Sequence, residues 1–336
     1  MSHLGSAYTI KGLTLQNRIV MPPMCQYSAE AKVGSPNDWH FVHYVSRAVG
    51  GTGLIIMEMT DIDPYGGISD HDLGLWSDEQ IPAFARLISE VQKYGTKIGV
   101  QIAHSGRKAE VPVAPSAIPL SPEHETPRAL TTEEVKDLVK KFKESARRAV
   151  EAGMDTLQIH AAHGYLIHQF HSPSINERDD EYGRDLARFG LEVIEAFRSV
   201  MPEDMPLIMR ISAIEYMEGG YDLEYSIDLA RRYQEAGVDM FDVSSGGEAP
   251  LGNRKPGNYP GYQVPFAKAF KEALNVPVIA VGMLDDPALA EETIAKGEAD
   301  LIAVGRSMLR DPYWAFHALK TLEEDAKPPM PYRLGY

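Results

Sequence analysis

Eight short apolar segments alternate with helical patterns along this chain, and that alternation limits the possible folds more than any other feature. The segments recur at intervals of roughly 25 to 60 residues. They show little polar alternation, as expected for parallel strands covered on both faces. They span Arg18–Met24, Thr52–Glu58, Lys97–His104, Asp155–Ala162, Pro206–Ser212, Met240–Ser245, Val276–Gly282 and Ala299–Arg306.

Helical patterns fill the intervals between these segments. Asp286-Pro287 pairs an N-cap with a proline at the first helical position, and Gly153 and Gly237 end two helices. Eight β/α units without a composition shift predict an α/β protein, a single-domain (β/α)8 TIM barrel over residues 1–336. The expected helices are Asp38–Val49, Asp78–Tyr94, Thr131–Ala152, Gly183–Val200, Leu223–Ala236, Gln263–Leu274, Pro287–Lys296 and Pro312–Leu322.

Three segments lie outside the repeat. Within residues 1–17, Tyr8–Leu15 reads as a hairpin turning at Lys11-Gly12, which could plug the N-terminal end of the barrel. The proline-rich stretch Lys108–Arg128 predicts an excursion or lid after the third strand. The C-terminal tail, residues 325–336, contains too many prolines for a helix and is expected to be extended.

The charge and cysteine content exclude several classes of function. A net charge of −15 disfavours nucleic acid and anionic membranes as partners. The single cysteine, Cys25, excludes intramolecular disulfides and cysteine-ligated clusters. We expect a cytoplasmic protein, because the cysteine usage fits a reducing compartment and neither a signal peptide nor a membrane-spanning apolar run is recognisable.

The carboxyl ends of the predicted strands carry the candidate functional residues, as in other barrels. Gly282 and Gly305, with Arg306, end the last two strands, where barrels commonly bind phosphate through bare backbone N–H groups. The alternative is that the glycines only allow tight turns and Arg306 forms a surface ion pair. A bound phosphate could belong to a substrate or to a cofactor.

His160 and His163 at the end of the fourth strand admit three interpretations. A metal site would need a further ligand, and residues three apart on a strand face opposite sides unless the chain has turned. Two buried structural histidines beside Gly164 would be unusual. As hydrogen-bond donors to a developing oxyanion, with Tyr165 as proton donor, they form a coherent catalytic cluster.

Three further strand-end residues suit a planar heterocycle. Cys25 follows the rigid Pro22-Pro23-Met24 segment beside Tyr27, although a lone cysteine is more often an inert buried residue. Arg210 in an apolar strand needs an anion or an electron-rich ring edge, and Gln101 offers both a donor and an acceptor. Neither a dinucleotide-binding glycine fingerprint nor a P-loop is present.

Together these residues resemble the old yellow enzymes, FMN-dependent NADPH dehydrogenases and ene-reductases, and within them the bacterial thermophilic-like subgroup. The resemblance covers essentially the whole chain. It is carried by Asn17–Tyr27, Gly53–Glu58, Gln101–Lys108, His160–Phe170 (HAAHGYLIHQF), Ser172-Pro173, Asn176, Arg178–Gly183, Arg210–Ser212, Ala280–Met283 and Val304–Arg306.

The resemblance implies a bound FMN and NADPH as hydride donor, in a ping-pong reduction of activated alkenes bearing a carbonyl or nitro group. His160 and His163 would hold the substrate oxygen, Tyr27 would contact the substrate, and Tyr165 would protonate it. Cys25 would tune the flavin and is counted with the catalytic residues; a metal is not expected. The implied FMN-binding residues are Pro22, Pro23, Met24, Cys25, Met59, Gln101, Arg210, Gly282, Met283, Gly305 and Arg306.

Two positions depart from the subgroup. Met59 stands where a small residue is usual. The tail reads Tyr332-Arg333-Leu334-Gly335-Tyr336. In the subgroup an arginine of the tail reaches into a neighbouring subunit; here the arginine stands one residue earlier, which in an extended chain places it on the other face.

The resemblance also implies a homodimer or homotetramer. Two competing hypotheses remain: a non-redox barrel lyase or isomerase acting on a phosphorylated substrate, and a non-catalytic ligand-binding barrel.

Overall fold

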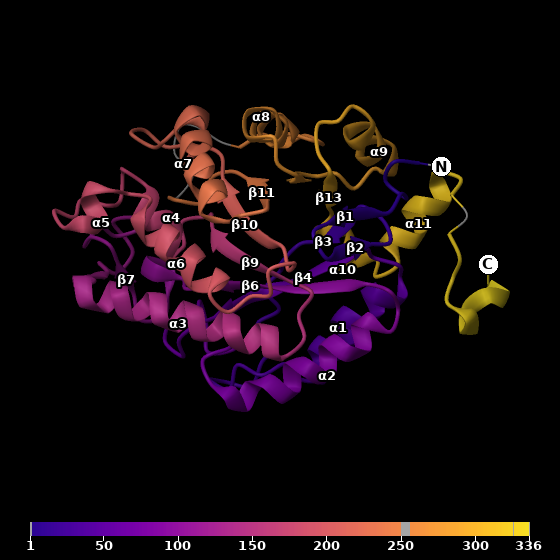
Figure 1. Cartoon of the computed structure of the whole chain (residues 1–336), viewed down its shortest axis with the longest axis horizontal. Coiled ribbons are helices and arrows are strands. Elements are labelled where there is room, and N and C mark those ends of the chain that lie inside the picture. Colours follow the sequence, from indigo (N-terminus) through magenta and orange to yellow (C-terminus); the bar gives the residue numbers. More distant parts are fainter. Residues whose placement is uncertain (1, 250–255, 325, 336) are drawn as a thin grey trace.

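Parallel strands form a closed ring at the centre of the protein (Figure 1). The computed structural model describes residues 2–249, 256–324 and 326–335. Within these ranges eight strands run in the order β3-β13-β12-β11-β10-β9-β6-β4, and pairing of β3 with β4 closes the predicted barrel. The strands are β3 (Ile19–Met21), β4 (Leu54–Asp61), β6 (Lys97–Ala103), β9 (Thr156–Ala161), β10 (Leu207–Ser212), β11 (Met240–Ser244), β12 (Val278–Val281) and β13 (Leu301–Ala303).

Amphipathic helices follow the strands and cover the outside of the barrel (Figure 1). The 20-residue α3 begins in a capping box: Thr131 accepts the backbone N–H of Glu134, whose carboxylate accepts the N–H of Thr131. Asp286 caps α9 ahead of Pro287, as predicted. The helices are α1 (Asp38–Val49), α2 (Ile81–Gln92), α3 (Thr132–Glu151), α6 (Arg188–Arg198), α7 (Leu223–Ala236), α8 (Val264–Leu274), α9 (Pro287–Ala295) and α11 (Trp314–Thr321).

The N-terminal hairpin plugs one end of the barrel, as predicted. Strands β1 (Tyr8–Ile10) and β2 (Leu13–Leu15) pair in antiparallel fashion. Leu13 and Leu15 are buried in a cluster with inward-facing residues of the barrel strands, such as Ile208. Because this apolar layer fills the amino ends of the strands, polar side chains can gather only at the opposite end.

Several elements differ from the predicted ones. Short helices α4 (Leu166–His171) and α10 (Arg306–Arg310) occupy segments predicted as a loop and a strand end. The single helix predicted over Gly183–Val200 is divided into α5 (Glu181–Arg184) and α6. The excursion after β6 holds the paired short strands β7 (Val113–Ala114) and β8 (Arg128–Ala129). The remaining short elements are β5 (Leu73–Gly74), which adds to β4, and the 3₁₀ helices η1 (Asp78–Gln80) and η2 (Gly106–Lys108).

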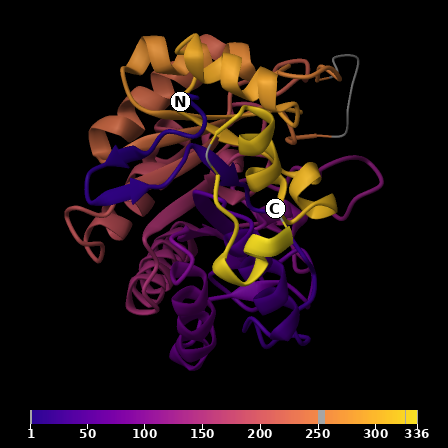
Figure 2. The same cartoon turned by 90° about the vertical axis from the view of Figure 1, so that its right-hand side faces the viewer.

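The prediction of an extended tail is wrong for its last turn. Residues Met330–Gly335 form the 3₁₀ helix η3, since proline is tolerated in the first turn of a helix. Arg333 therefore lies on a helical turn, and the alternating faces of an extended chain do not determine its direction. The tail lies on the same side of the molecule as the N-terminus (Figure 1, Figure 2).

In the described part of the chain, no helix is both long enough and apolar enough to cross a membrane.

Candidate active site

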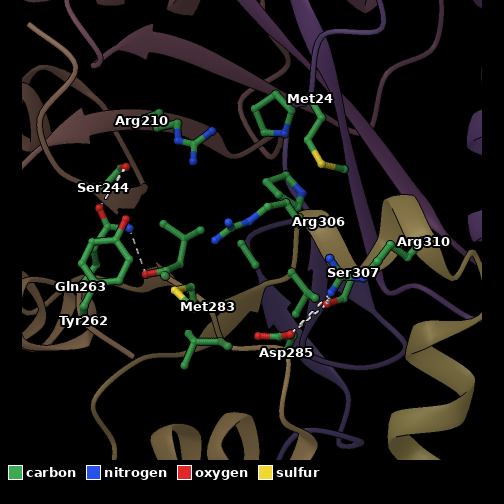
Figure 3. Close-up of a pocket in the computed structure, with 18 residues that line it drawn as sticks. Met24, Arg210, Ser244, Tyr262, Gln263, Met283, Asp285, Arg306, Ser307 and Arg310 are labelled. Carbon is green, nitrogen blue, oxygen red and sulfur yellow. Dashed lines mark hydrogen bonds and ion pairs between the residues drawn. The ribbon is translucent and has the colours of Figure 1, made fainter. Parts of the chain in front are cut away.

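A cavity of about 410 Å³ opens at the carboxyl ends of β3 and β10 to β13 (Figure 3). This is the end at which barrel enzymes hold their active sites. Cys25, Met59 and Gln101 do not line it, although they were predicted to bind the same cofactor. The predicted cofactor residues that do line it are Pro22, Pro23, Met24, Arg210, Gly282, Met283, Gly305 and Arg306.

One end of this cavity has the features of an anion site. Gly282 has φ +132°, and a Cβ there would lie 3.2 Å from the backbone nitrogen of Gln263, so a side chain would be both strained and crowded. Gly305 precedes α10, whose first turn lacks a side-chain cap. Arg306 extends into the cavity (Figure 3), and no ion pair holds it among the described residues. Bare N–H groups beside an arginine suit a phosphate.

Two residues that sequence reasoning missed shape the wall next to Gly282. Gln263 is buried; its side-chain oxygen accepts from Ser245 at 2.5 Å and its nitrogen donates to the carbonyl of Val281 at 3.2 Å. Tyr262 lies beside it on the cavity wall (Figure 3). The available signal was weak, because Gln263 reads only as the first residue of an expected helix.

A row of buried polar side chains crosses the barrel below the cavity. The Arg210 Nε lies 3.3 Å from a carboxylate oxygen of Asp242, which is the anion that a buried arginine requires. Gln158 donates to the same oxygen at 3.1 Å and accepts from Gln101 at 2.7 Å. Gln101 is therefore connected to Arg210 through two side chains, even though it lies outside the cavity wall.

His160, His163 and Tyr165 come together at the end of β9. The two imidazole centroids are 5.3 Å apart, and the Tyr165 ring is 4.8 Å from that of His160. This is possible because the chain is no longer extended at His163, where φ is +60°. His160 and His163 are therefore not held on opposite faces of one strand. His163 Nε2 lies 2.8 Å from the Ser244 hydroxyl, which connects the cluster to the cavity wall.

Burial keeps both histidines neutral. It lowers the pKa of His160 and of His163 well below the ordinary value, and the nearby charge of Arg210 lowers both further. His160 Nδ1 is buried without a hydrogen-bond partner in the described structure. Neutral imidazoles can donate one N–H each without carrying charge into the site.

Lys108 adds a cation that sequence reasoning did not assign to the site. Its ammonium donates to the carbonyl of His163 at 2.7 Å and to that of Gly247. It also lies 5.3 Å from the centroid of the Tyr165 ring. Burial lowers the pKa of Lys108 to about 8, whereas burial raises that of Tyr165. The phenol is therefore protonated at neutral pH.

Cys25 and Tyr27 lie on a segment held by a buried glutamate. Glu58, at an irregularity in the pairing of β4 with β6, accepts the backbone N–H of Gln26 at 3.0 Å and the Tyr44 hydroxyl at 2.7 Å. Tyr27, with φ +50°, is half exposed. The segment beside the cavity thus depends on Glu58, a carboxylate that the sequence alone did not identify as functional.

Met59 faces the protein interior. Its side chain is buried, and its sulfur accepts the Ser105 hydroxyl at 4.0 Å. The bulky side chain therefore fills space within the fold at this position.

The Cys25 thiol is expected to be unreactive at neutral pH. Burial, with the charge of Glu58, raises its pKa to about 12, so the thiol stays protonated below that value and the thiolate grows as pH rises toward it. Alkylation by iodoacetamide should be slow at pH 7 and should accelerate about tenfold per pH unit up to at least pH 10. Because the chain has one cysteine, mass spectrometry reports this site alone. Rapid alkylation that levels off below pH 8 would contradict the assignment.

Comparisons with known proteins give this site a context. The sequence profile of the NADH:flavin oxidoreductase / NADH oxidase family matches residues 6–325. A Listeria innocua protein named NADPH dehydrogenase is 48% identical over 99% of this chain and 98% of its own length. A Bacillus subtilis protein of the same name is 46% identical over 98% of this chain and 97% of its own length.

Solved structures share the fold. Morphinone reductase superposes with a TM-score of 0.82 at 26% identity, over 99% of this chain and 92% of that chain. A 2-naphthoyl-CoA reductase complex reaches a TM-score of 0.90 at 24% identity, over 96% of this chain and 52% of that chain. The second likeness, at this identity, concerns the fold alone.

Proposed function

Because this chain belongs to the NADH:flavin oxidoreductase / NADH oxidase family, an FMN-dependent family, we propose that it is an NADPH-oxidising ene-reductase. Its substrates would be α,β-unsaturated carbonyl or nitro compounds. The observation that carries the proposal is the cluster of His160, His163 and Tyr165 at the barrel mouth, next to the cavity. It combines two neutral N–H donors with one protonated phenol.

The residues present fit FMN. Gly282 and Gly305, with Arg306, would provide a cradle for a phosphate. A side chain at Gly282 would disturb this cradle, because its Cβ would crowd Gln263. Pro22, Pro23, Met24 and Met283 would wall the cavity around the flavin. At its polar edge, the guanidinium of Arg210, which lines the cavity, would donate, with Gln101 behind it. Cys25, on the segment after β3, and Met59, on β4, would also contact the flavin.

When bound, FMN would supply the hydride chemistry that links NADPH to the β-carbon of the alkene. His160 and His163 would donate hydrogen bonds to the substrate oxygen, where negative charge builds as the β-carbon is attacked. Donors that are fixed before the reaction lower the barrier, because they need not reorganise as charge appears. Their lowered pKa values support this role, since each neutral ring keeps an N–H without attracting a counter-ion.

Tyr165 would complete the reduction by giving its phenolic proton to the α-carbon. The ammonium of Lys108, 5.3 Å from the ring centroid, would stabilise the phenolate that this transfer leaves. Tyr27, half exposed beside the site, would contact the substrate. Cys25 would act as a neutral thiol that tunes the flavin.

Stepwise anaerobic spectroscopy tests the proposal. Protein purified with FMN should show a flavin band that NADPH bleaches, and 2-cyclohexenone should restore the band with formation of cyclohexanone. A colourless protein would favour the lyase or isomerase hypothesis, which family membership already disfavours. A flavin that NADPH does not bleach would favour the non-catalytic barrel. If NADPH bleaches the flavin band but neither an enone nor a nitroalkene restores it, the protein is an NADPH dehydrogenase that passes its electrons to another class of acceptor.

Assembly and location are further parts of the proposal. We expect a homodimer or homotetramer in the cytoplasm. On the tail, Met330 (67% exposed) and Leu334 (94% exposed) are large apolar residues that a neighbouring subunit would cover in such an assembly. Arg333 lies on the same short helix, η3.

A further inference from the structure

His168 is a buried histidine that has no role in the mechanism above. It lies on α4, three residues after Tyr165, and is fully buried. Its Nε2 is 3.0 Å from a carboxylate oxygen of Glu215 and 3.1 Å from one of Glu248. Glu248 in turn pairs with the buried Arg107, at 2.9 Å.

The hydrogen bond at the other ring nitrogen determines which tautomer is present. The backbone N–H of Gly164 donates to His168 Nδ1 at 3.1 Å, so Nδ1 is an acceptor and carries no proton. Nε2 must then carry the proton, which it donates to Glu215; the Glu248 oxygen lies 3.1 Å away but accepts no hydrogen bond in the described structure. His168, Glu215 and Glu248 have the spacing of a metal site, but a metal would need the electron pair of Nε2 that this proton occupies.

The geometry of the catalytic cluster depends on a turn at His163 and Gly164. His163 and Gly164 are consecutive left-handed residues, with φ +60° and +71°. This turn carries His163 to His160 and allows Tyr165 to approach the same ring. A left-handed conformation is strained at a non-glycine residue and persists only where surrounding contacts hold it.

The carboxylates connect this turn to two neighbouring loops. Glu215 follows β10 and accepts the backbone N–H of Tyr221 at 2.8 Å. Glu248 follows β11, and Arg107 from the excursion after β6 donates to both its carboxylate and its backbone carbonyl. One histidine thus joins the loops after β6, β9, β10 and β11.

We propose that His168 is a positioning residue: it holds the Gly164 N–H through Nδ1, and its Nε2–H, donated to Glu215 beside the Glu248 carboxylate, keeps its ring in place. His163 and Tyr165 are thereby held in one arrangement for the substrate. The inference rests on the proposed function for its catalytic meaning, but the hydrogen bond itself can be tested without turnover.

Two substitutions separate the two sides of the ring. In His168→Asn the amide oxygen can replace Nδ1 as acceptor for Gly164. In His168→Gln the longer amide can reach the carboxylates but leaves Gly164 without its acceptor. We expect His168→Gln to slow reoxidation of reduced FMN by 2-cyclohexenone by about 10- to 100-fold and to weaken binding of 4-hydroxybenzaldehyde. His168→Asn should recover much of the loss, and reduction by NADPH should change little in both.

Hydrogen exchange read by mass spectrometry provides the second measurement. Peptides covering residues 160–170 should exchange faster in holoenzyme carrying His168→Gln than in holoenzyme carrying His168→Asn. Equal exchange and equal reoxidation rates in both variants and the wild type would overturn the inference while the proposed function stands. Equal damage in both variants, with parallel loss of FMN and of melting temperature, would indicate a structural role and also overturn it.

Two other results are distinguishable from these. A stoichiometric metal in the wild-type holoenzyme that is lost in His168→Gln would show that Nε2 is a ligand, against the inference. If the wild type is not reoxidised by any activated alkene, the proposed function fails. Exchange at residues 160–170 and binding of 4-hydroxybenzaldehyde then still decide whether His168 positions the turn.

Discussion

Tyr165→Phe is expected to slow the reoxidation of reduced FMN by 2-cyclohexenone by about 10²- to 10⁴-fold, the usual contribution of a positioned general acid. Reduction by NADPH should be nearly unchanged, because that step needs no proton from the phenol. The ring itself should stay in place, since its contacts with His160 and Lys108 involve the ring and not the hydroxyl. Anaerobic stopped-flow absorbance separates the two half-reactions.

A suitable control is Tyr94→Phe, because Tyr94 is partly exposed and follows α2, outside the site. It should match the wild type in both half-reactions. Equal slowing of the two half-reactions in Tyr165→Phe would contradict the assignment of Tyr165 as proton donor. A nitroalkene substrate should be less affected than the enone, because the nitronate formed after hydride transfer is stable enough to take its proton from water.

His163→Ala is expected to slow the same reoxidation by about 10²- to 10³-fold, as removal of one oxyanion donor does elsewhere. It should also weaken the binding of 4-hydroxybenzaldehyde, whose phenolate oxygen resembles the charged substrate oxygen. His163→Asn is the matched variant, because asparagine retains an N–H donor and tolerates the φ of +60° at this position. It should lie between the wild type and His163→Ala.

His163→Gly distinguishes hydrogen bonding from backbone strain, because glycine lacks the donor but adopts a left-handed backbone without strain. If the hydrogen bond causes the loss, His163→Gly should be as slow as His163→Ala. Unchanged affinity for 4-hydroxybenzaldehyde in His163→Ala would remove His163 from the substrate site. His317→Ala, on the outer helix α11, controls for loss of a histidine and should leave both half-reactions unchanged.

The repeat of apolar segments and caps predicted the barrel because those signals are local. Thr131 and Glu134 cap α3 through atoms three residues apart, and such pairs can be read directly from the sequence. The proline content of the tail predicts an extended chain, but Pro331 lies in the first turn of η3, where a proline is tolerated. The short helix α10 was missed because its five residues carry too little periodicity.

The candidate site was predicted as a set of residues but not as an arrangement. The sequence placed Gly282, Gly305 and Arg306 at strand ends, and they line one cavity. It did not identify Gln263 or Glu58, because their partners lie 14 to 32 residues away along the chain. Ordinary polar residues such as these become part of a site only through the neighbours that folding supplies.

Sequence alone determined the barrel and the end of it at which the polar residues gather, because strand and helix signals depend on nearby residues and parallel strands share one direction. Tertiary structure decided how His160 and His163 lie, since only the left-handed turn at His163 and Gly164 brings their rings to 5.3 Å. It also decided their charge. A histidine takes its pKa from burial and from Arg210 on the adjacent strand, and neither can be read from the sequence of β9.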